Sequence, residues 1–174
     1  MRPQRIAGDP ILASRLRQVL RGDVLFDAFS RGRYSTDASI YQIEPIGVAL
    51  PRGTEDVEAA VALAREEGFP VIARGGGSSQ NGQTLGRAVV LDTSRYMNRV
   101  LEVDAQAGTA VVEPGIVLDE LNRQLKSTGW YFPVDVSTSA NATIGGMTGN
   151  NSAGTRSIKY GIMVHNVLEV QAVL

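Results

Sequence analysis

A strand–helix–strand pattern near the start of the chain most constrains its fold. The apolar runs Ile46–Leu50 and Pro70–Ala73 each have the length and composition of a buried strand. Between them, Glu55–Glu67 carries apolar residues at helical spacing, with Thr54 as the expected N-cap and Gly68 as the stop. Because a helical connection of this length joins strands that run the same way, the two strands are predicted to be parallel.

A glycine-rich loop, residues 74–83, follows the second strand directly. Its three consecutive glycines, Gly75–Gly77, expose backbone N–H groups without a Cβ, which suits phosphate oxygens. Parallel α/β folds place their ligands at this end of a strand. The loop is not a P-loop, because no Gly-Lys-Ser/Thr follows, nor a Rossmann fingerprint, because Gln80 replaces the third glycine. A mobile, exposed turn is the alternative interpretation.

A second polar, glycine-rich stretch runs from Val136 to Gly161. Within it, Thr143 is placed to cap a short helix that begins near Ile144. Gly145 and Gly146 would let a ligand approach the first turn of that helix, where the helix dipole favours an anion. Taken alone, this stretch is equally typical of a polar loop.

The remaining elements follow from periodicity and turn residues. Residues 31–44 are polar and turn-rich. Gly129 is expected to end the helix predicted over Val117–Lys126. The chain stops within its last apolar run, as though the sequence had been cut. The predicted elements are a helix over Pro10–Leu20, a strand over Ala88–Asp92, a hairpin of Val100–Val103 with Thr109–Glu113, a helix over Val117–Lys126, and a strand over Val164–Leu174.

Composition excludes several classes of function. With 17 basic and 18 acidic residues, the net charge of -1 favours neither nucleic acid nor an anionic membrane as a partner. No apolar stretch is long enough to span a bilayer, and no signal core follows the basic start Met1–Arg5, so the cytoplasm is the expected compartment. The absence of cysteine and the single histidine, His165, predict no metal site in this segment.

Taken together, the two glycine-rich segments resemble the FAD-binding domain shared by vanillyl-alcohol oxidase, p-cresol methylhydroxylase, glycolate oxidase and D-lactate dehydrogenase. The resemblance covers residues 34–174, and the order and spacing of its motifs agree throughout. These motifs are Tyr34-Ser35-Thr36-Asp37, Thr54-Glu55-Asp56-Val57, Gly75-Gly76-Gly77, Val112-Glu113-Pro114-Gly115, Ala142-Thr143-Ile144-Gly145-Gly146, Asn151-Ser152-Ala153-Gly154 and Lys159-Tyr160-Gly161.

The resemblance implies an α+β fold of two lobes with FAD between them. Residues 1–44 would form an N-terminal helix and a lead-in, and residues 45–174 the FAD-binding domain. Its first lobe, about residues 45–95, would be a small parallel sheet with helices. Its second lobe, about residues 97–174, would be larger, mainly antiparallel and incomplete at the C-terminal side.

The resemblance also gives residues their roles. The first loop would wrap the FAD pyrophosphate, with Arg74 either holding phosphate or shaping the loop, and the second stretch would close the pocket from the other side. No residue of this segment is expected to be catalytic, and without cysteine the FAD is expected to be bound non-covalently. The expected cofactor-binding residues are Arg74, Gly75, Gly76, Gly77, Ser78, Ser79, Gly82, Gln83, Pro133, Asp135, Ala142, Thr143, Gly145, Gly146, Asn151 and Gly154.

The most similar subgroup is that of the D-2-hydroxy-acid dehydrogenases, which act on D-lactate, glycolate or D-2-hydroxyglutarate. The resemblance therefore implies hydride transfer from a small 2-hydroxy acid to FAD, with an electron acceptor and an oligomeric state that the sequence does not identify. The lead-in Tyr34–Gln42 resembles long bacterial members that add an iron–sulfur region, which here would lie beyond residue 174 and bring any peripheral membrane contact. The alternatives are another flavoenzyme of the superfamily, such as the FAD- and NADPH-dependent reductase of cell-wall precursor synthesis, and a non-redox nucleotide-binding module.

Other candidate residues have plainer interpretations. His165 is expected to be structural, and the aromatic run Trp130–Phe132 is expected to pack, with a flavin contact as the alternative. The acidic pairs Glu66-Glu67 and Asp119-Glu120 are interpreted as solvated helix faces.

Overall fold

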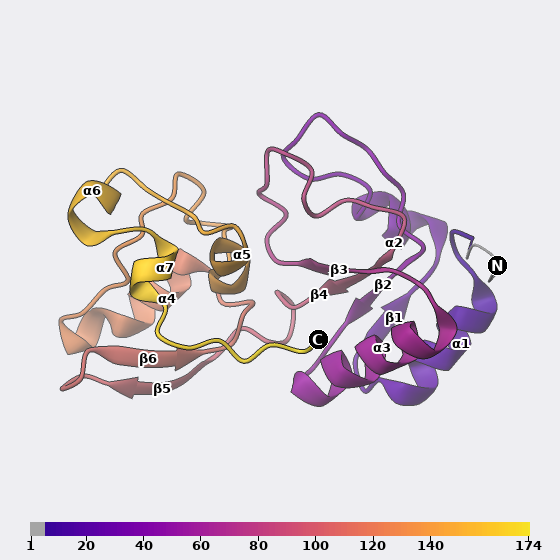
Figure 1. Ribbon diagram of the computed structural model, residues 1–174, viewed down its shortest axis with the longest axis horizontal. Coiled ribbons are helices and arrows are strands. Elements are labelled where there is room, and N and C mark those ends of the chain that lie inside the picture. The colour runs from indigo at the N-terminus through magenta and orange to yellow at the C-terminus, as the bar shows by residue number, and fades with distance from the viewer. Residues whose placement is uncertain (1–5) are drawn as a thin grey trace.

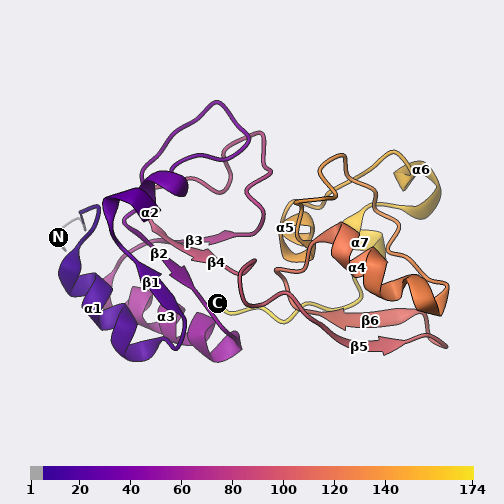
Figure 2. The same ribbon diagram turned by 180° about the vertical axis from the view of Figure 1, so that it is seen from behind.

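Two lobes lie side by side in a computed structural model that describes residues 6–174 (Figure 1). The basic start, Met1–Arg5, lies outside the described residues. Residues 93–99 connect the last strand of the first lobe to the first strand of the second, and the view from behind shows the same separation (Figure 2). The expected two-lobed α+β architecture is confirmed.

The first lobe contains a four-stranded sheet in the order β1-β2-β4-β3. Strands β2 (Gly47–Leu50) and β3 (Val71–Arg74) are parallel, as predicted, and β4 (Val89–Asp92) lies between them and pairs with both. An edge strand that the sequence pattern did not reveal, β1 (Asp23–Leu25), pairs antiparallel with β2. Three residues are too few to display a periodicity, so only the tertiary pairing identifies this strand.

Helices α1 (Pro10–Val19) and α3 (Thr54–Glu67) cover one face of this sheet (Figure 1). Their buried side chains pack on β2 and β4, and the opposite face of the sheet is covered in part by Tyr34 and Tyr96. A short helix, α2 (Ala28–Arg33), leads into Tyr34. The main cluster of buried residues in this lobe is Leu12, Ala13, Leu16, Leu20, Val24, Phe26, Ile46, Ala49, Ala60, Leu63, Ala64, Phe69, Val89 and Leu91.

The sequence predicted one end of α3 correctly and placed the other one residue too far along the chain. Gly68 ends the helix in the left-handed conformation at φ 73°, as predicted. The expected cap was wrong: Thr54 is the first helical residue, and Gly53 precedes it in extended conformation without a side-chain hydrogen bond. Glu67 also departs from the expected solvated face, because its side chain is only 10% exposed and lies 2.9 Å from the Arg15 guanidinium of α1.

The second lobe is built on the predicted hairpin, β5 (Val100–Asp104) with β6 (Thr109–Val112). Helix α4 (Leu118–Leu125) continues as a 3-10 turn over Lys126–Thr128, and Gly129 ends it in the left-handed conformation. The polar stretch contains two short helices, α5 (Ile144–Gly149) and α6 (Ser157–Tyr160). The core residues of this lobe are Ile116, Leu118, Leu121, Leu125, Val134, Ala142, Ile144, Met147 and Met163.

The strand predicted over Val164–Leu174 is wrong. Its first residues belong to a four-residue helix, α7 (Met163–Asn166), in which His165 Nδ1 accepts a hydrogen bond of 3.1 Å from the Ile162 N–H. Residues 167–174 run back toward the first lobe without regular structure (Figures 1 and 2). An apolar run becomes a strand only when a neighbouring strand satisfies its backbone groups, and within residues 6–174 none pairs with it.

A charged clamp closes the open end of the β5–β6 hairpin. The Arg99 guanidinium donates two hydrogen bonds to Glu113, Nε to Oε2 at 3.1 Å and Nη2 to Oε1 at 2.7 Å, and the Arg99 N–H donates a third to Oε2 at 2.8 Å. These bonds favour the charged carboxylate, so Arg99 lowers the pKa of Glu113 below its ordinary value of 4.5, although burial opposes the shift.

We expect Glu113→Gln to lower the free energy of unfolding by about 1 kcal/mol at neutral pH, since the Arg99 side chain is 67% exposed and solvent weakens the pair. A carboxyl whose pKa is lower in the folded than in the unfolded protein stabilises the fold fully above its unfolded pKa. The difference between wild type and variant should therefore shrink as the pH falls below 4.5. Urea unfolding at neutral and acidic pH measures it. Glu102→Gln, on the exposed side of β5, is the matched control, and an equal loss in both variants would contradict the clamp.

Candidate functional site

The two glycine-rich segments meet at the junction of the lobes. An ideal Cβ placed on Gly75 would lie 2.0 Å from Thr143 Oγ1, and one on Gly76 would lie 2.0 Å from the Asn141 carbonyl oxygen. Both distances are far inside van der Waals contact, so only glycine fits at these positions. The glycine loop after β3 is therefore in direct contact with the segment that enters α5, a contact that the sequence did not predict.

The backbone N–H groups of residues 75–79 form the most distinctive feature of this junction. Within residues 6–174, no protein atom accepts a hydrogen bond from any of these five groups. The residues are exposed or half-buried, and Gly77 takes the left-handed conformation at φ 63°. A turn of successive N–H groups with no internal partner is the backbone geometry that binds phosphate or another anion.

Helix α5 offers no such donors. Thr143 caps it as predicted, since its Oγ1 accepts a hydrogen bond of 3.3 Å from the Gly146 N–H. The N–H of Ile144 donates to the Ile116 carbonyl at 2.9 Å, and that of Gly145 to the Pro114 carbonyl at 2.8 Å. The N–H groups that were expected to attract an anion at the start of this helix are therefore already paired within the protein. The Cα atoms of Gly145 and Gly146 can still contribute a surface.

A polar bridge joins the two segments at a second point. Gln83 Nε2, at the end of the glycine loop, donates a hydrogen bond of 2.8 Å to Asn150 Oδ1 at the end of α5. The Ser79 hydroxyl bonds to the side-chain oxygen of Gln83, and the Ser79 Oγ accepts from the Asn81 N–H at 3.2 Å. These contacts close the loop on itself and tie it to the second lobe.

The side chain of Asp135 makes its hydrogen bonds within the second lobe. Its carboxylate accepts hydrogen bonds from the Thr155 hydroxyl at 2.6 Å and from the Arg156 N–H at 2.9 Å, and an ideal Cβ on Gly154 would lie 2.4 Å from Asp135 Oδ1. The bond from Thr155, followed by that from Arg156, lowers the pKa of Asp135. Asp135 therefore stays ionised and shapes the turn at Gly154 by direct contact.

Asn151 is held in the left-handed conformation at φ 47°, which is unusual for a residue other than glycine. Its Oδ1 accepts a hydrogen bond of 3.0 Å from the Val164 N–H, so the residue links the end of α5 to α7. Of the other expected site residues, Pro133 precedes the buried Val134, and Ala142 is itself buried. Asn151 and Ala142 thus contribute to the packing of the second lobe.

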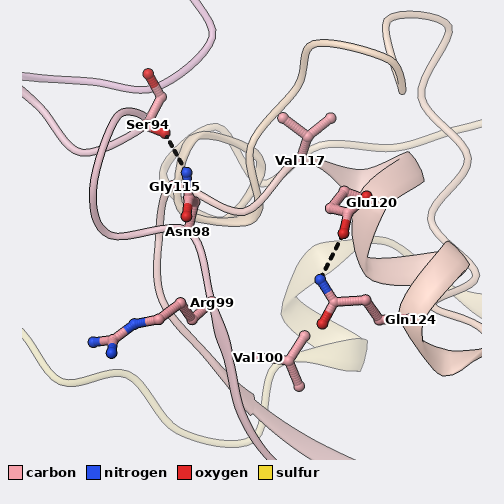
Figure 3. A pocket seen from close by; sticks show the side chains of 8 residues that line it. All are labelled: Ser94, Asn98, Arg99, Val100, Gly115, Val117, Glu120 and Gln124. Carbon is pink, nitrogen blue, oxygen red and sulfur yellow. Dashed lines mark hydrogen bonds between the residues drawn. The ribbon is translucent and has the colours of Figure 1, made fainter.

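A pocket of about 540 Å³ lies beside the junction but contains none of the expected site residues. Two pairs of its polar groups bond to one another (Figure 3): Asn98 Nδ2 donates to the Ser94 carbonyl at 3.0 Å, and Gln124 Nε2 donates to Glu120 at 2.6 Å. Hydrogen bonds from Arg123 and Gln124 lower the pKa of Glu120 to about 2, so it does not act as a general acid. The pocket is lined by Ser94, Asn98, Arg99, Val100, Gly115, Val117, Glu120 and Gln124.

Other candidate residues have structural contacts. Trp130 Nε1 donates to the Ala105 carbonyl at 3.0 Å, and Tyr131 packs edge-on against Tyr160 with ring centroids 6.2 Å apart. His165 uses its Nδ1 in the turn of α7. Over residues 6–174, no three His, Asp or Glu side chains are grouped to hold a metal ion, and no helix in that range is long and apolar enough to cross a membrane.

Residues 45–174 match the model of a family described as an FAD binding domain. The chain belongs to this family. The FAD-binding domain thus contains both segments that meet at the junction, and the expected cofactor class is confirmed.

Relatives of this FAD-binding domain include hydroxy-acid enzymes. It is 40% identical to D-2-hydroxyglutarate dehydrogenase from Escherichia coli (strain K12), over 91% of this chain and 16% of the relative. It is 36% identical to glycolate oxidase subunit GlcD from Bacillus subtilis (strain 168), over 86% of this chain and 33% of that subunit. The chain therefore spans a minor part of these relatives.

Solved structures show the same fold. An alkyldihydroxyacetonephosphate synthase superposes with a TM-score of 0.80 at 29% identity, over 89% of this chain and 31% of that one. A p-cresol methylhydroxylase superposes with a TM-score of 0.68 at 20% identity, over 84% of this chain and 30% of that one, which shows a shared fold alone. The expected vanillyl-alcohol-oxidase type of fold is confirmed.

We expect Gly76→Ala to weaken FAD binding about tenfold or more, because its Cβ would force the loop away from Asn141, and such overpacking costs about 1–3 kcal/mol. Gly149→Ala is the matched control, since a Cβ there meets no atom within 4 Å. FAD titration followed by flavin fluorescence, with circular dichroism to check folding, measures both variants. Equal affinities in the two folded variants would show that the contact does not shape the site.

Proposed function

We propose that residues 75–79 bind the pyrophosphate of FAD through their backbone N–H groups. The observation that carries this assignment is the row of five donors that have no partner among residues 6–174, at the carboxyl end of a parallel strand. Two linked phosphates present enough acceptor oxygens to occupy several such donors. Family membership supplies the cofactor, and the donor row supplies its point of attachment in this chain.

The second segment is proposed to form the opposite wall. In this arrangement Gly82 and Gln83 extend the loop, while the α5 segment provides a close-packed surface without competing donors. Asp135 and Asn151 act by holding the turns around that wall. The residues proposed to bind FAD or to shape its site are Arg74, Gly75, Gly76, Gly77, Ser78, Ser79, Gly82, Gln83, Pro133, Asp135, Ala142, Thr143, Gly145, Gly146, Asn151 and Gly154.

The protein to which this domain belongs is proposed to oxidise a 2-hydroxy acid. The support is the similarity to D-2-hydroxyglutarate dehydrogenase and a glycolate oxidase subunit. When bound, FAD supplies the redox chemistry by accepting a hydride, while protein residues bind and orient it. In this chain, residues 75–79 would hold the anionic end, and the contact at Gly75 and Gly76 would set the distance between the two walls.

We expect the flavin to be FAD and to be held without a covalent bond, since the chain has no cysteine and Ser78 and Ser79 follow the glycines. Acid treatment of the flavin-loaded protein should release all flavin into the supernatant, where chromatography identifies it. Release of FMN would remove the reason for a pyrophosphate site. Flavin that stays with the precipitated chain would refute non-covalent binding and leave the choice of FAD intact.

We expect these 174 residues alone to give no measurable turnover of D-lactate, glycolate or D-2-hydroxyglutarate. They span 16% of the dehydrogenase relative, and the chain's one histidine already uses its Nδ1 within α7. The measurement is dye reduction by the FAD-loaded chain in the presence of each acid. Turnover that is lost in His165→Ala would show that a catalytic group lies within these residues.

A further inference from the structure

The segment before the matched family residues folds against the glycine loop. We propose that this lead-in, Tyr34–Ile43, holds the loop in the conformation that presents its N–H groups, and that Arg74 is a positioning residue rather than a phosphate ligand. This inference rests on the proposed cofactor site and adds to it residues 34–43, which precede the family match. Three independent contacts carry it.

The first contact is centred on Arg74, the last residue of β3. Its Nη2 donates a hydrogen bond of 2.9 Å to the Thr36 carbonyl, and its guanidinium carbon lies 5.2 Å from the centre of the Tyr34 ring. The loop packs directly against the Arg74 guanidinium, because an ideal Cβ at Gly77 would lie 2.5 Å from Nη2. The guanidinium thus lies between the lead-in and the turn of the loop.

Tyr34 is itself held in place. Its hydroxyl donates a hydrogen bond of 2.7 Å to Asp92 Oδ2, and Asp92 is buried and also accepts from the N–H and hydroxyl of Ser94. Burial, followed by the bond to Asp92, raises the pKa of Tyr34, so the hydroxyl keeps its proton and remains a donor. The ring under Arg74 is therefore fixed to the end of β4.

The second contact sets the direction of the loop's peptide groups. The Ala38 N–H donates a hydrogen bond of 3.1 Å to the Gly77 carbonyl. In a trans peptide, the carbonyl and the following N–H point in opposite directions. Holding the Gly77 carbonyl toward the lead-in therefore turns the Ser78 N–H away from it, as a row of donors for a ligand requires.

The third contact secures the far side of the loop. The Thr84 hydroxyl donates a hydrogen bond of 3.1 Å to Asp37 Oδ2, while Asp37 Oδ1 accepts from the Ser39 N–H at 2.8 Å. The Tyr41 ring lies against Gly82, where a Cβ would come within 2.9 Å of Cδ2. The lead-in therefore contacts the loop at its beginning, middle and end.

The Nη1 nitrogen of Arg74 distinguishes a positioning role from direct binding of phosphate. Nη1 is buried, and no atom within residues 6–174 bonds to it. Because solvent does not reach this nitrogen, a phosphate on the surface of the loop would not contact it unless its surroundings moved. Arg74 consequently acts on a ligand through the loop that it supports.

Nuclear magnetic resonance relaxation of the FAD-free protein tests the proposal directly. In wild type, the backbone amides of residues 75–79 should have order parameters of about 0.85. In Arg74→Ala and Arg74→Lys, these order parameters should fall below about 0.6. Lysine keeps the charge but lacks the planar fork that both stacks and bonds, so it should not restore order. Thr84→Val, which leaves Arg74 intact, should also lower the order parameters. Arg87→Ala, which removes an exposed arginine two residues before β4, is the charge-matched control.

FAD titrations of the same variants complete the test. Affinity should fall about tenfold in Arg74→Ala and Arg74→Lys and several-fold in Thr84→Val, and should stay unchanged in Arg87→Ala. An ordered loop in Arg74→Ala with weakened FAD binding, together with an unaffected Thr84→Val, would overturn the proposal in favour of direct phosphate contact. Failure of wild type to bind FAD would instead refute the proposed function, while the order parameters would still decide whether the lead-in positions the loop.

Discussion

The approach of two backbones at the lobe junction is the constraint on which the rest of the structure depends. Gly75 and Gly76 lie so close to Thr143 and Asn141 that a single added carbon would separate the lobes. This contact places the donor row of residues 75–79 opposite the α5 segment. A mutation there changes the geometry of both segments together, so under the proposed function the two lobes would act as one binding unit.

The division of hydrogen bonds between the walls follows from their local structure. The start of α5 directs its N–H groups to Pro114, Ile116 and its own cap, so that wall is internally satisfied. Across residues 6–174, the N–H groups of residues 75–79 find no acceptor, and the lead-in bonds instead to the Gly77 carbonyl. In the proposed site, a wall whose N–H groups are already paired, beside an open row of donors, would bind an anionic ligand in one orientation.

The lead-in gives residues outside the matched family range a part in the site. Arg74 belongs to the loop motif, yet its partners Tyr34 and Thr36 precede residue 45. Support of this kind keeps a glycine-rich segment, whose backbone entropy is high, in one conformation before the ligand arrives. A domain boundary at residue 45 would thus separate the loop from the contacts that order it.

The sequence by itself determined the parallel strands, the hairpin, the long helices and the motifs of an FAD-binding family, because local periodicity, glycine stops and motif spacing are written in neighbouring residues. It could not reveal β1, the Gly53 cap or the irregular path of residues 167–174, since a strand depends on its partner and a cap on its surroundings. Tertiary structure alone decided which N–H groups remain available. That outcome depends on distant acceptors, such as Pro114 for Gly145, whose proximity no local pattern encodes.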